Sequence, residues 1–494
     1  MNESAFDSLI RRLQTHRNAR DVVAVFSALI VCWAVGQSVA RQNLTLPIAL
    51  AGATIFVLVF FRRASLLFLA PAAMCAPNMG LDIPGPWAIS IEDAFVMLGF
   101  AALVARGIVL GRPIIPRNLP AIRPMFAFWG IAMLSIVKTA LISRSSLMLV
   151  AKDLMRLSLL MLFFVVMVDA IRTKAHLRTI TRVLIALAVP MAAISWYIYL
   201  TKSEFFYTIL TMKPAYIYYR GNILRMISIA GSTSFTGLYY AVILALALNH
   251  LPFFRNTTTR AWGYAIAGLL LSCLAMTFNR GTWVGVLFGY FLLSLVGQLN
   301  WRRVVVAAML LGGLALITSA HFFQQLEVEN KLNVLIEVSR SSGTTRLVRW
   351  MSSINVILDQ PLLGVGYNNY AYVYGLYSIE EGITRLYGSP HNMYVDVVTG
   401  TGLVGFFVFS TWMYRLWRIH VENLRGTVDP EMKLLAVGLF LAFGIFLGAS
   451  GFDSFFFKPH HTSFILMILW AMSVALWRIN RDDAADATET ERSS

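Results

Sequence analysis

The sequence predicts an all-α, polytopic membrane protein with about 12–14 transmembrane helices. Of its 494 residues, 58% are hydrophobic and only 13% are charged, and its mean hydropathy is +0.67. A soluble domain carries about 25% charged residues, so this composition excludes a soluble globular protein. Apolar stretches long enough to cross the hydrocarbon layer recur along the chain. They are expected to be helices, because the backbone of each span must satisfy its own hydrogen bonds within lipid.

The apolar stretches divide the chain into regions. The polar, basic segment 1–21 is too long and too polar for a secretory signal peptide and is expected in the cytoplasm. The remaining regions are helices 1–11 (22–320), a large external loop with an amphipathic helix (321–391), helices 12–14 (392–478) and a disordered cytoplasmic tail (479–494). The spans are placed at about 22–40, 44–61, 65–80, 93–110, 125–142, 156–171, 179–200, 232–249, 262–278, 282–298, 304–320, 394–414, 434–450 and 461–478. The third is short and Pro-rich, so it is alternatively broken or re-entrant.

The positions of the basic residues predict the orientation. The net charge is +16, but most Lys and Arg residues lie in short loops between spans, which argues against a nucleic-acid-binding surface. Such loops are typical of the cytoplasmic side. The basic loops include 106–123, 171–182, 250–260 and 414–426. The external segments are then 202–225, 279–281, 321–391 and 451–460.

Cysteines and paired histidines give no sign of a metal centre. Cys32, Cys75 and Cys273 lie in apolar segments, and their odd number and irregular spacing argue against disulfides or a Cys-based metal site. His460 and His461 are adjacent, but no HExxH or Hx3H spacing accompanies them. No metal and no cofactor are expected.

The external loop contains two arginines on a predicted amphipathic helix. Arg346 and Arg349 are three residues apart and would share one helix face. The apolar residues of this segment are Leu347, Trp350, Ile354, Ile357 and Leu358. Two interpretations stay open: a helix at the membrane surface whose arginines meet lipid phosphates, or arginines that bind an anionic substrate.

A glycine turn follows this helix. Pro361 ends it, and Gly364 and Gly366 turn the chain. The Gly-Val-Gly sequence is not a dinucleotide fingerprint, because no strand precedes it and the third glycine is missing.

His391 opens a span in the sequence SPHNMYVDVV. A histidine can take a proton from a hydroxyl near neutral pH, so His391 is a candidate base. The alternative is an interfacial or helix-capping role, with Asn392 or Ser389 as candidate caps.

Further external cations and aromatic residues have two interpretations each. Arg280 lies between two spans, where a charge costs about 2.5–3.5 kcal/mol, so it needs a partner or a wet cavity. Arg225, Lys138, Arg144, Lys152 and Arg156 are flanking charges or substrate ligands. The tyrosines of the external loop are either an interfacial belt or a surface on which sugar rings stack.

Four features in this order resemble the O-antigen ligase and O-antigen polymerase family of bacterial membrane glycosyltransferases. They are Arg225 before a span, FNRGTWVG around Arg280, RLVRW followed by QPLLGVGYNNY, and SPHNMYVDVVTGTGLVG. The resemblance covers about residues 220–410. One departure is visible at Gly400, where family members often carry an acidic residue. That role then shifts to Asp396 or to another carboxylate.

The resemblance implies a GT-C-like fold in the bacterial inner membrane with a periplasmic active site. It implies a donor glycan on undecaprenyl pyrophosphate, an acceptor that is a glycan or the lipid A core, and further polysaccharide assembly proteins as partners. Arg225, Arg280, Arg346 and Arg349 would bind pyrophosphate, and His391 would be catalytic. A polymerase of O-antigen or exopolysaccharide is favoured over a lipid A core ligase.

Two other classes of function are weighed against this one. A transporter or flippase for an anionic lipid-linked substrate would fit many spans and internal charges, but the sequence shows no inverted repeat. A scaffold without activity would tolerate replacement of the arginines.

Overall fold

The computed structural model describes residues 80–82, 88–110, 119–142, 146–202, 219–220, 223–228, 232–251, 257–298, 309, 346–379, 389–455 and 461–493. Within these ranges the fold is helical apart from two short hairpins. These are β1 (Gly80–Asp82) with β2 (Ala88–Ser90), and β3 (Tyr219–Arg220) with β4 (Ile223–Leu224). The N-terminal segment, nearly all of the first three predicted spans and nearly all of the span at 304–320 lie outside the described residues.

The labelled helices are α5 (Ile91–Leu110), α6 (Ile122–Leu134), α7 (Ile136–Ile142), α8 (Leu147–Ala170), α9 (Lys174–Thr201), α11 (Thr233–His250), α12 (Thr257–Met276), α13 (Arg280–Leu295), α16 (Tyr370–Tyr377), α17 (Met393–Gly426), α18 (Pro430–Ala449) and α19 (His461–Ser493). A further helix covers 346–359. Among the described residues, six helices are long and apolar enough to cross a membrane. The all-α, polytopic membrane class is confirmed, while the total of 12–14 spans stays a prediction.

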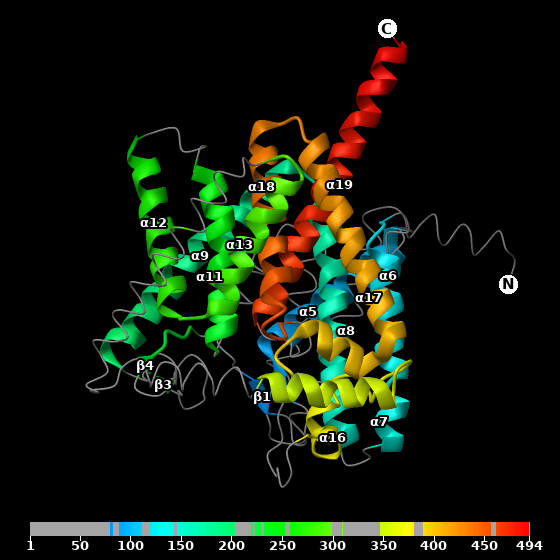
Figure 1. Ribbon diagram of the computed structural model, residues 1–494. Helices are drawn as coiled ribbons and strands as arrows, with labels where there is room; N and C mark the ends of the chain where they lie inside the picture. Colours follow the sequence, from blue (N-terminus) through cyan, green and yellow to red (C-terminus); the bar gives the residue numbers. More distant parts are fainter. Residues whose placement is uncertain are drawn as a thin grey trace, which may run out of the picture.

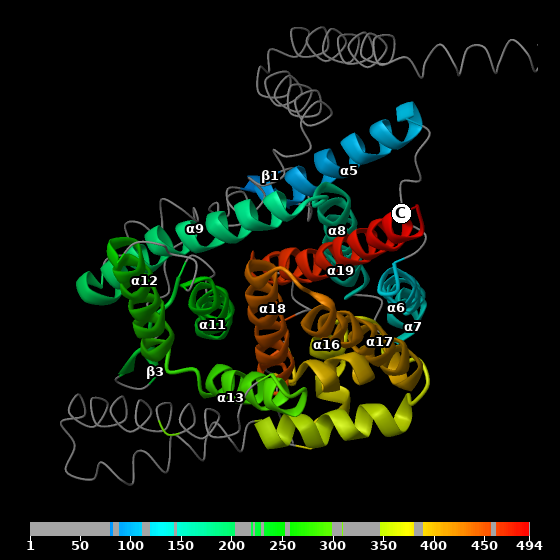
Figure 2. The ribbon, with the colours of Figure 1, turned by 90° about the horizontal axis from the view of Figure 1, so that it is seen from above.

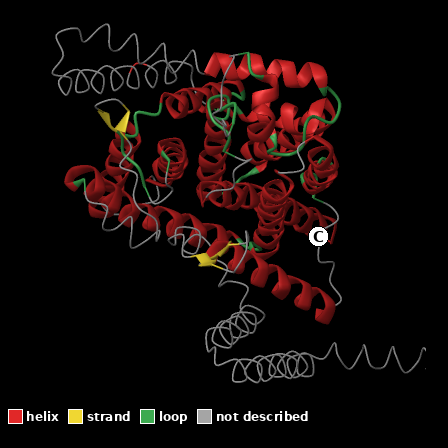
Figure 3. Ribbon diagram, turned by 90° about the horizontal axis from the view of Figure 1, so that it is seen from below, coloured by secondary structure: helices red, strands yellow, loops and turns green. Residues whose placement is uncertain are grey.

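The helices run between two ends of the molecule (Figure 1). At the lower end of Figure 1, α8, α11, α13, α17 and α19 begin, and α9, α12 and α18 end. Helix 346–359 and α16 lie across this lower end, which Figure 3 views face on. The basic loop after α8 and the loop between α17 and α18 lie at the upper end. The predicted external and cytoplasmic segments are therefore at opposite ends wherever they are described, although which end faces the cytoplasm stays a prediction.

Helix α19 occupies the centre of the bundle (Figure 2). In its apolar part, 94% of the residues are buried, so protein surrounds it on nearly all sides. Trp470 of α19 packs edge-on against Trp412 of α17, with 5.6 Å between ring centroids. These aromatic contacts fix α17 against the centre.

Helices α13 and α18 pack with their backbones in close contact. A Cβ atom added to Gly285 would lie 2.6 Å from the carbonyl oxygen of Ile445, and one added to Gly444 would lie 2.7 Å from the Cα of Gly289. Small residues allow this approach between membrane helices. Glycine at these positions therefore sets the distance between the two helices.

Helix α17 is broken at Gly402, whose φ of 68° and ψ of −172° lie far from helical values. The turn 361–366 fills the break. Four hydrogen bonds join the two segments: Val365 N–H to Thr399 O (2.9 Å), Gly366 N–H to Gly400 O (3.1 Å), Leu403 N–H to Pro361 O (2.8 Å) and Val404 N–H to Leu362 O (3.3 Å). The predicted glycine turn thus exists, and it satisfies backbone groups that the broken helix leaves exposed within the membrane.

Two predicted non-helical segments are helical in the structure. Residues 414–426, expected as a basic loop, continue α17, because Ile419, His420 and Asn423 bury one face while Arg418 and Glu422 pair on the other at 3.1 Å. The tail 479–494, expected to be disordered, continues α19 as far as Ser493. Its alanines favour helix, and Asp483 pairs with Lys174 at 2.8 Å.

Candidate active site

His391 lies in the short loop that leads into α17. Its φ of 55° is in the left-handed region, which is uncommon for residues other than glycine. The His391 N–H donates to the Ser389 hydroxyl at 3.0 Å. Asn392 caps α17 by accepting from the N–H groups of Tyr394 and Val395. The predicted capping role therefore belongs to Asn392, and the side chain of His391 is left for another contact.

That contact is Asp453, in the loop after α18. His391 Nδ1 lies 3.0 Å from Asp453 Oδ1. The carboxylate also accepts from the N–H of Ser454 at 2.9 Å. Half of the imidazole remains accessible, since 42% of the His391 side chain is exposed against 17% for Asp453. The arrangement resembles a base with an orienting carboxylate behind it.

The environment of Asp453 keeps its carboxylate ionised. Burial raises its pKa, but hydrogen bonds from His391, Ser234 and the Ser454 backbone, together with the charge of His391, outweigh burial and hold the pKa below the usual value. A negative Asp453 favours the tautomer in which Nδ1 of His391 carries the proton.

A buried carboxylate holds the two loops together. Asp396, in the first turn of α17, is only 6% exposed. It accepts from the hydroxyl of Ser389 at 2.9 Å and also from the hydroxyl of Ser454. Because Ser389 precedes His391 and Ser454 follows Asp453, Asp396 joins the loop of the histidine to the loop of its partner.

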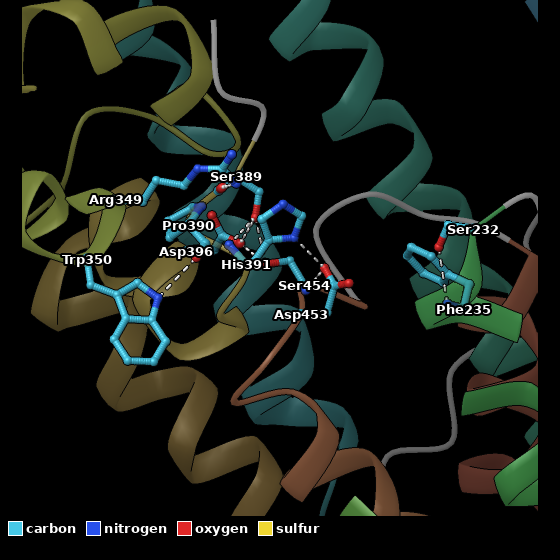
Figure 4. A network of polar contacts seen from close by, with 10 residues as sticks. All are labelled: Ser232, Phe235, Arg349, Trp350, Ser389, Pro390, His391, Asp396, Asp453 and Ser454. Carbon is cyan, nitrogen blue, oxygen red and sulfur yellow. Dashed lines mark hydrogen bonds and ion pairs between the residues drawn. The ribbon is translucent and has the colours of Figure 1, made fainter. Parts of the chain in front are cut away.

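Helix 346–359 supports the histidine loop from the other side, as Figure 4 shows. Arg349 Nη1 donates to the carbonyl oxygen of Ser389 at 3.4 Å. Trp350 Nε1 donates to the carbonyl oxygen of Pro390 at 3.0 Å. Both carbonyl groups belong to the two residues before His391, so this helix limits the movement of the loop.

Arg225 binds the turn between α12 and α13. Its Nε donates to the carbonyl oxygen of Thr277 at 2.9 Å, and its Nη2 donates to that of Phe278 at 2.8 Å. Asn279 then caps α13 by accepting from the Gly281 N–H. The turn that Arg225 holds leads directly into Arg280, the exposed first residue of α13.

The Arg280 turn also touches the loop of Asp453. A Cβ atom added to Gly281 would lie 2.6 Å from the Cβ of Phe452. Gly281 follows Arg280 and Phe452 precedes Asp453. The structure thus brings the turns of Arg225 and Arg280 next to the loop that pairs with His391.

The predicted residues do not all have equal roles. Arg225, Arg280, Arg349 and His391 lie around one set of loops at the lower end. Arg346 begins helix 346–359, one turn before Arg349. Gly400 lies beside the turn at Gly366, because a Cβ atom added to Gly400 would lie 3.3 Å from the Gly366 carbonyl oxygen. Asp396, one turn before Gly400, is the carboxylate that contacts this loop system.

The tyrosines of the external loop correct one expectation. Tyr367, Tyr370 and Tyr374 are buried, so they form neither an exposed belt nor a stacking surface. Tyr370 and Tyr374 are buried because α16 packs against helix 346–359, where the Tyr370 hydroxyl donates to the Arg349 carbonyl at 2.9 Å. Tyr367 lies in the main core, where its N–H donates to the Ser135 hydroxyl at 2.8 Å.

Sequence reasoning missed Asp453. Its only signal was a single acidic residue in GFDSFF, within a segment already assigned to the external side. Within the described ranges, no group of three or more His, Cys, Asp or Glu side chains could hold a metal ion. His460 and the His461 side chain lie outside the described part.

Residues 265–410 match the sequence model of a family described as O-antigen ligase. This segment belongs to the O-antigen ligase family. The resemblance drawn from the motifs is therefore confirmed for this segment, which supports an enzyme of the O-antigen ligase and polymerase type. The matched O-antigen ligase segment contains Arg280, Arg346, Arg349 and His391.

Two other comparisons add no functional assignment. No curated protein matches the chain. One solved chain, from "Structural coordination of polymerization and crosslinking by a peptidoglycan synthase complex", has 18% sequence identity and a TM-score of 0.36, with 73% of this chain and 97% of that chain covered. So low a TM-score supports no argument about this chain.

Proposed function

We propose that the chain transfers a glycan from undecaprenyl pyrophosphate to an acceptor glycan at the periplasmic face of the inner membrane. The observation that carries this proposal is the pair of His391 and Asp453: the His391 side chain is 42% exposed, and the loop of Asp453 contacts the turn of Arg280. Polymerisation of an O-antigen or exopolysaccharide is the favoured reaction, and ligation to the lipid A core is the next.

His391 is the proposed base. With Nδ1 protonated and hydrogen-bonded to Asp453, Nε2 takes the proton of an acceptor hydroxyl. The hydroxyl oxygen attacks the anomeric carbon of the donor sugar, the bond from that carbon to the phosphate oxygen breaks, and the pyrophosphate leaves with the electron pair. A positioned base of this kind contributes about 10²- to 10⁴-fold in rate. A single displacement of this type inverts the anomeric centre.

The arginines would bind the leaving group. Guanidinium groups offer paired donors to phosphate oxygens. Arg280 also lies at the N-terminus of α13, where the positive end of the helix dipole favours an anion. Arg225 already donates to two carbonyl groups of the Arg280 turn, so we propose that it acts partly by holding Arg280 in place. Arg349 likewise donates to the Ser389 carbonyl, so we propose that it acts by holding the His391 loop, and that Arg346, one turn earlier on the same helix, is the phosphate ligand.

The decisive experiment is transfer in vitro by the purified protein in lipid nanodiscs. The donor is the lipid-linked repeat unit, supplied alone or with lipid A core. Polymer without core supports the polymerase, and product that depends on core supports the ligase. His391→Ala should abolish either product, whereas His176→Ala, at the upper end, should retain it. Wild-type chain length in folded His391→Ala protein would refute the proposal.

One observation favours a second candidate, a transporter or flippase. Transporters use broken helices near their binding sites, and α17 is broken at Gly402. The break is filled by hydrogen bonds to the turn 361–366, which argues for a packed joint. Movement of the lipid-linked substrate across liposomes, without glycan transfer, would establish the second candidate.

A further inference from the structure

Helix 346–359 has a buried face and an exposed apolar face. Ser352, Ser353 and Val356 are fully buried against the protein. The opposite face exposes four apolar side chains, which we call the outer stripe: Leu347 (55%), Met351 (45%), Ile354 (52%) and Leu358 (74%). Their spacing of three or four residues places them along one side of the helix. An exposed apolar row of this length requires a covering environment.

The outer stripe continues onto the surface of a membrane-spanning helix. After Leu358, the exposed Leu362 and Leu363 extend the row. The backbone of this turn is hydrogen-bonded to α17 at Leu403 and Val404. Both of those side chains are exposed, as is Phe407 one turn further along α17.

This continuity identifies the covering environment. Helix α17 has the length and hydropathy of a span, so its exposed apolar side chains face lipid. The outer stripe continues into the lipid-facing surface of α17 through Leu358, Leu362 and Leu363. The polar residues of this junction, Asp359 and Gln360, lie to the side of the stripe. Helix 346–359 also lies across the ends of the spans rather than along them (Figures 1 and 2). An amphipathic helix in this attitude lies in the plane of the membrane interface.

We propose that the outer stripe is seated in the bilayer interface, and that this lipid contact holds Arg349 and Trp350 in position to support the His391 loop. The two side chains donate to the carbonyl oxygens of Ser389 and Pro390. Trp350 is thus a positioning residue. The second half of the proposal rests on the proposed glycosyl transfer, whereas the lipid contact does not.

The lipid contact is tested without any activity measurement. Spin labels are placed at Met351→Cys and, as the matched control on the polar flank, at Asn355→Cys. The background carries Cys32→Ala, Cys75→Ala and Cys273→Ala, and the protein is held in phosphatidylethanolamine and phosphatidylglycerol nanodiscs. The label at 351 should relax mainly with oxygen and the label at 355 mainly with an aqueous nickel chelate. Equal exposure of both labels to the chelate would overturn the proposal. Dipolar broadening at 351 that vanishes on dilution with unlabelled protein would also overturn it, because a second copy of the chain would then cover the stripe.

The coupling to His391 is tested with carboxylates on the same helix. Ile354→Asp places a charge in the outer stripe, and Asn355→Asp places the same charge on the flank. Ile354→Asp should lower the kcat of folded protein, whereas Asn355→Asp should retain it. Trp350→Phe, which removes only the donor to Pro390, should reproduce the loss of kcat and leave the donor KM unchanged. Unchanged kcat in Ile354→Asp and Trp350→Phe would overturn the coupling, and absence of transfer by the wild type would refute the proposed function while the label result stands.

Discussion

Replacing Gly402 by alanine should destabilise the protein through the break in α17. Its φ of 68° and ψ of −172° belong to a region that is essentially restricted to glycine, and a Cβ atom would lie 2.1 Å from the carbonyl oxygen of Leu362. The strain of such a residue costs about 1–3 kcal/mol. If the turn 361–366 moves away, losing two of the four joining hydrogen bonds adds about 1–3 kcal/mol. The expected loss is therefore about 2–6 kcal/mol.

The free energy of unfolding can be measured by titrating sodium dodecyl sulfate into mixed micelles and following circular dichroism. Gly268→Ala is the matched control, because that glycine lies in α12 and an added Cβ meets nothing within 4 Å. The control should be unchanged or slightly more stable, since alanine favours helix over glycine by about 1 kcal/mol. If Gly402→Ala unfolds at the same detergent fraction as Gly268→Ala, the joint between α17 and the turn does not stabilise the protein.

Three further predictions concern the loops of the candidate site. Asp453→Asn should be less stable than the wild type at neutral pH, because folding lowers the Asp453 pKa. The ionised Asp453 side chain stabilises the fold above its usual pKa of about 4. That stabilisation is lost as the pH falls through the lower pKa of the folded state. Thermal unfolding of both proteins across acidic pH checks this, and a difference that persists under strongly acidic conditions contradicts it. Arg280→Ala should raise the donor KM in the transfer assay, whereas Arg260→Ala, exposed on α12 at the upper end, should not; equal KM values would remove Arg280 from the donor site. Asn392→Ala should lose about 1 kcal/mol of stability with its helix cap, measured in the same detergent titration, and a loss no larger than that of an exposed alanine substitution would contradict the capping role.

Hydropathy was sufficient to find the spans that the structure describes. The predicted spans at 179–200, 262–278 and 434–450 correspond to α9, α12 and α18 with small shifts at their ends. The same signal failed at 414–426, where charged residues suggest a loop. There the helix continues because its apolar side is buried, while Arg418 and Glu422 pair on the other side. Average hydropathy over a window cannot distinguish such a two-faced helix from a polar loop.

The motifs predicted His391 and the arginines as candidate site residues, but not the contacts that organise them. Asp453 is separated from His391 by two complete helices, and no local pattern relates the two positions. Arg225 looks like an ordinary flanking charge in the sequence, although it donates to two carbonyl groups at the end of α12. The left-handed conformation of His391 also depends on Ser389 and on the neighbouring loops. Such features depend on tertiary packing, which the sequence pattern does not encode locally.

The close contact of α13 and α18 restricts how a lipid substrate could enter the site. Backbone atoms of the two helices approach so closely at Gly285 and Gly444 that a methyl group cannot fit between them. A polyprenyl chain is wider than a methyl group, so it cannot slide sideways through this seam unless the helices separate. Under the proposed function, a lipid-linked donor would therefore enter through another opening between helices, and the α13–α18 pair forms a closed wall beside the Arg280 turn.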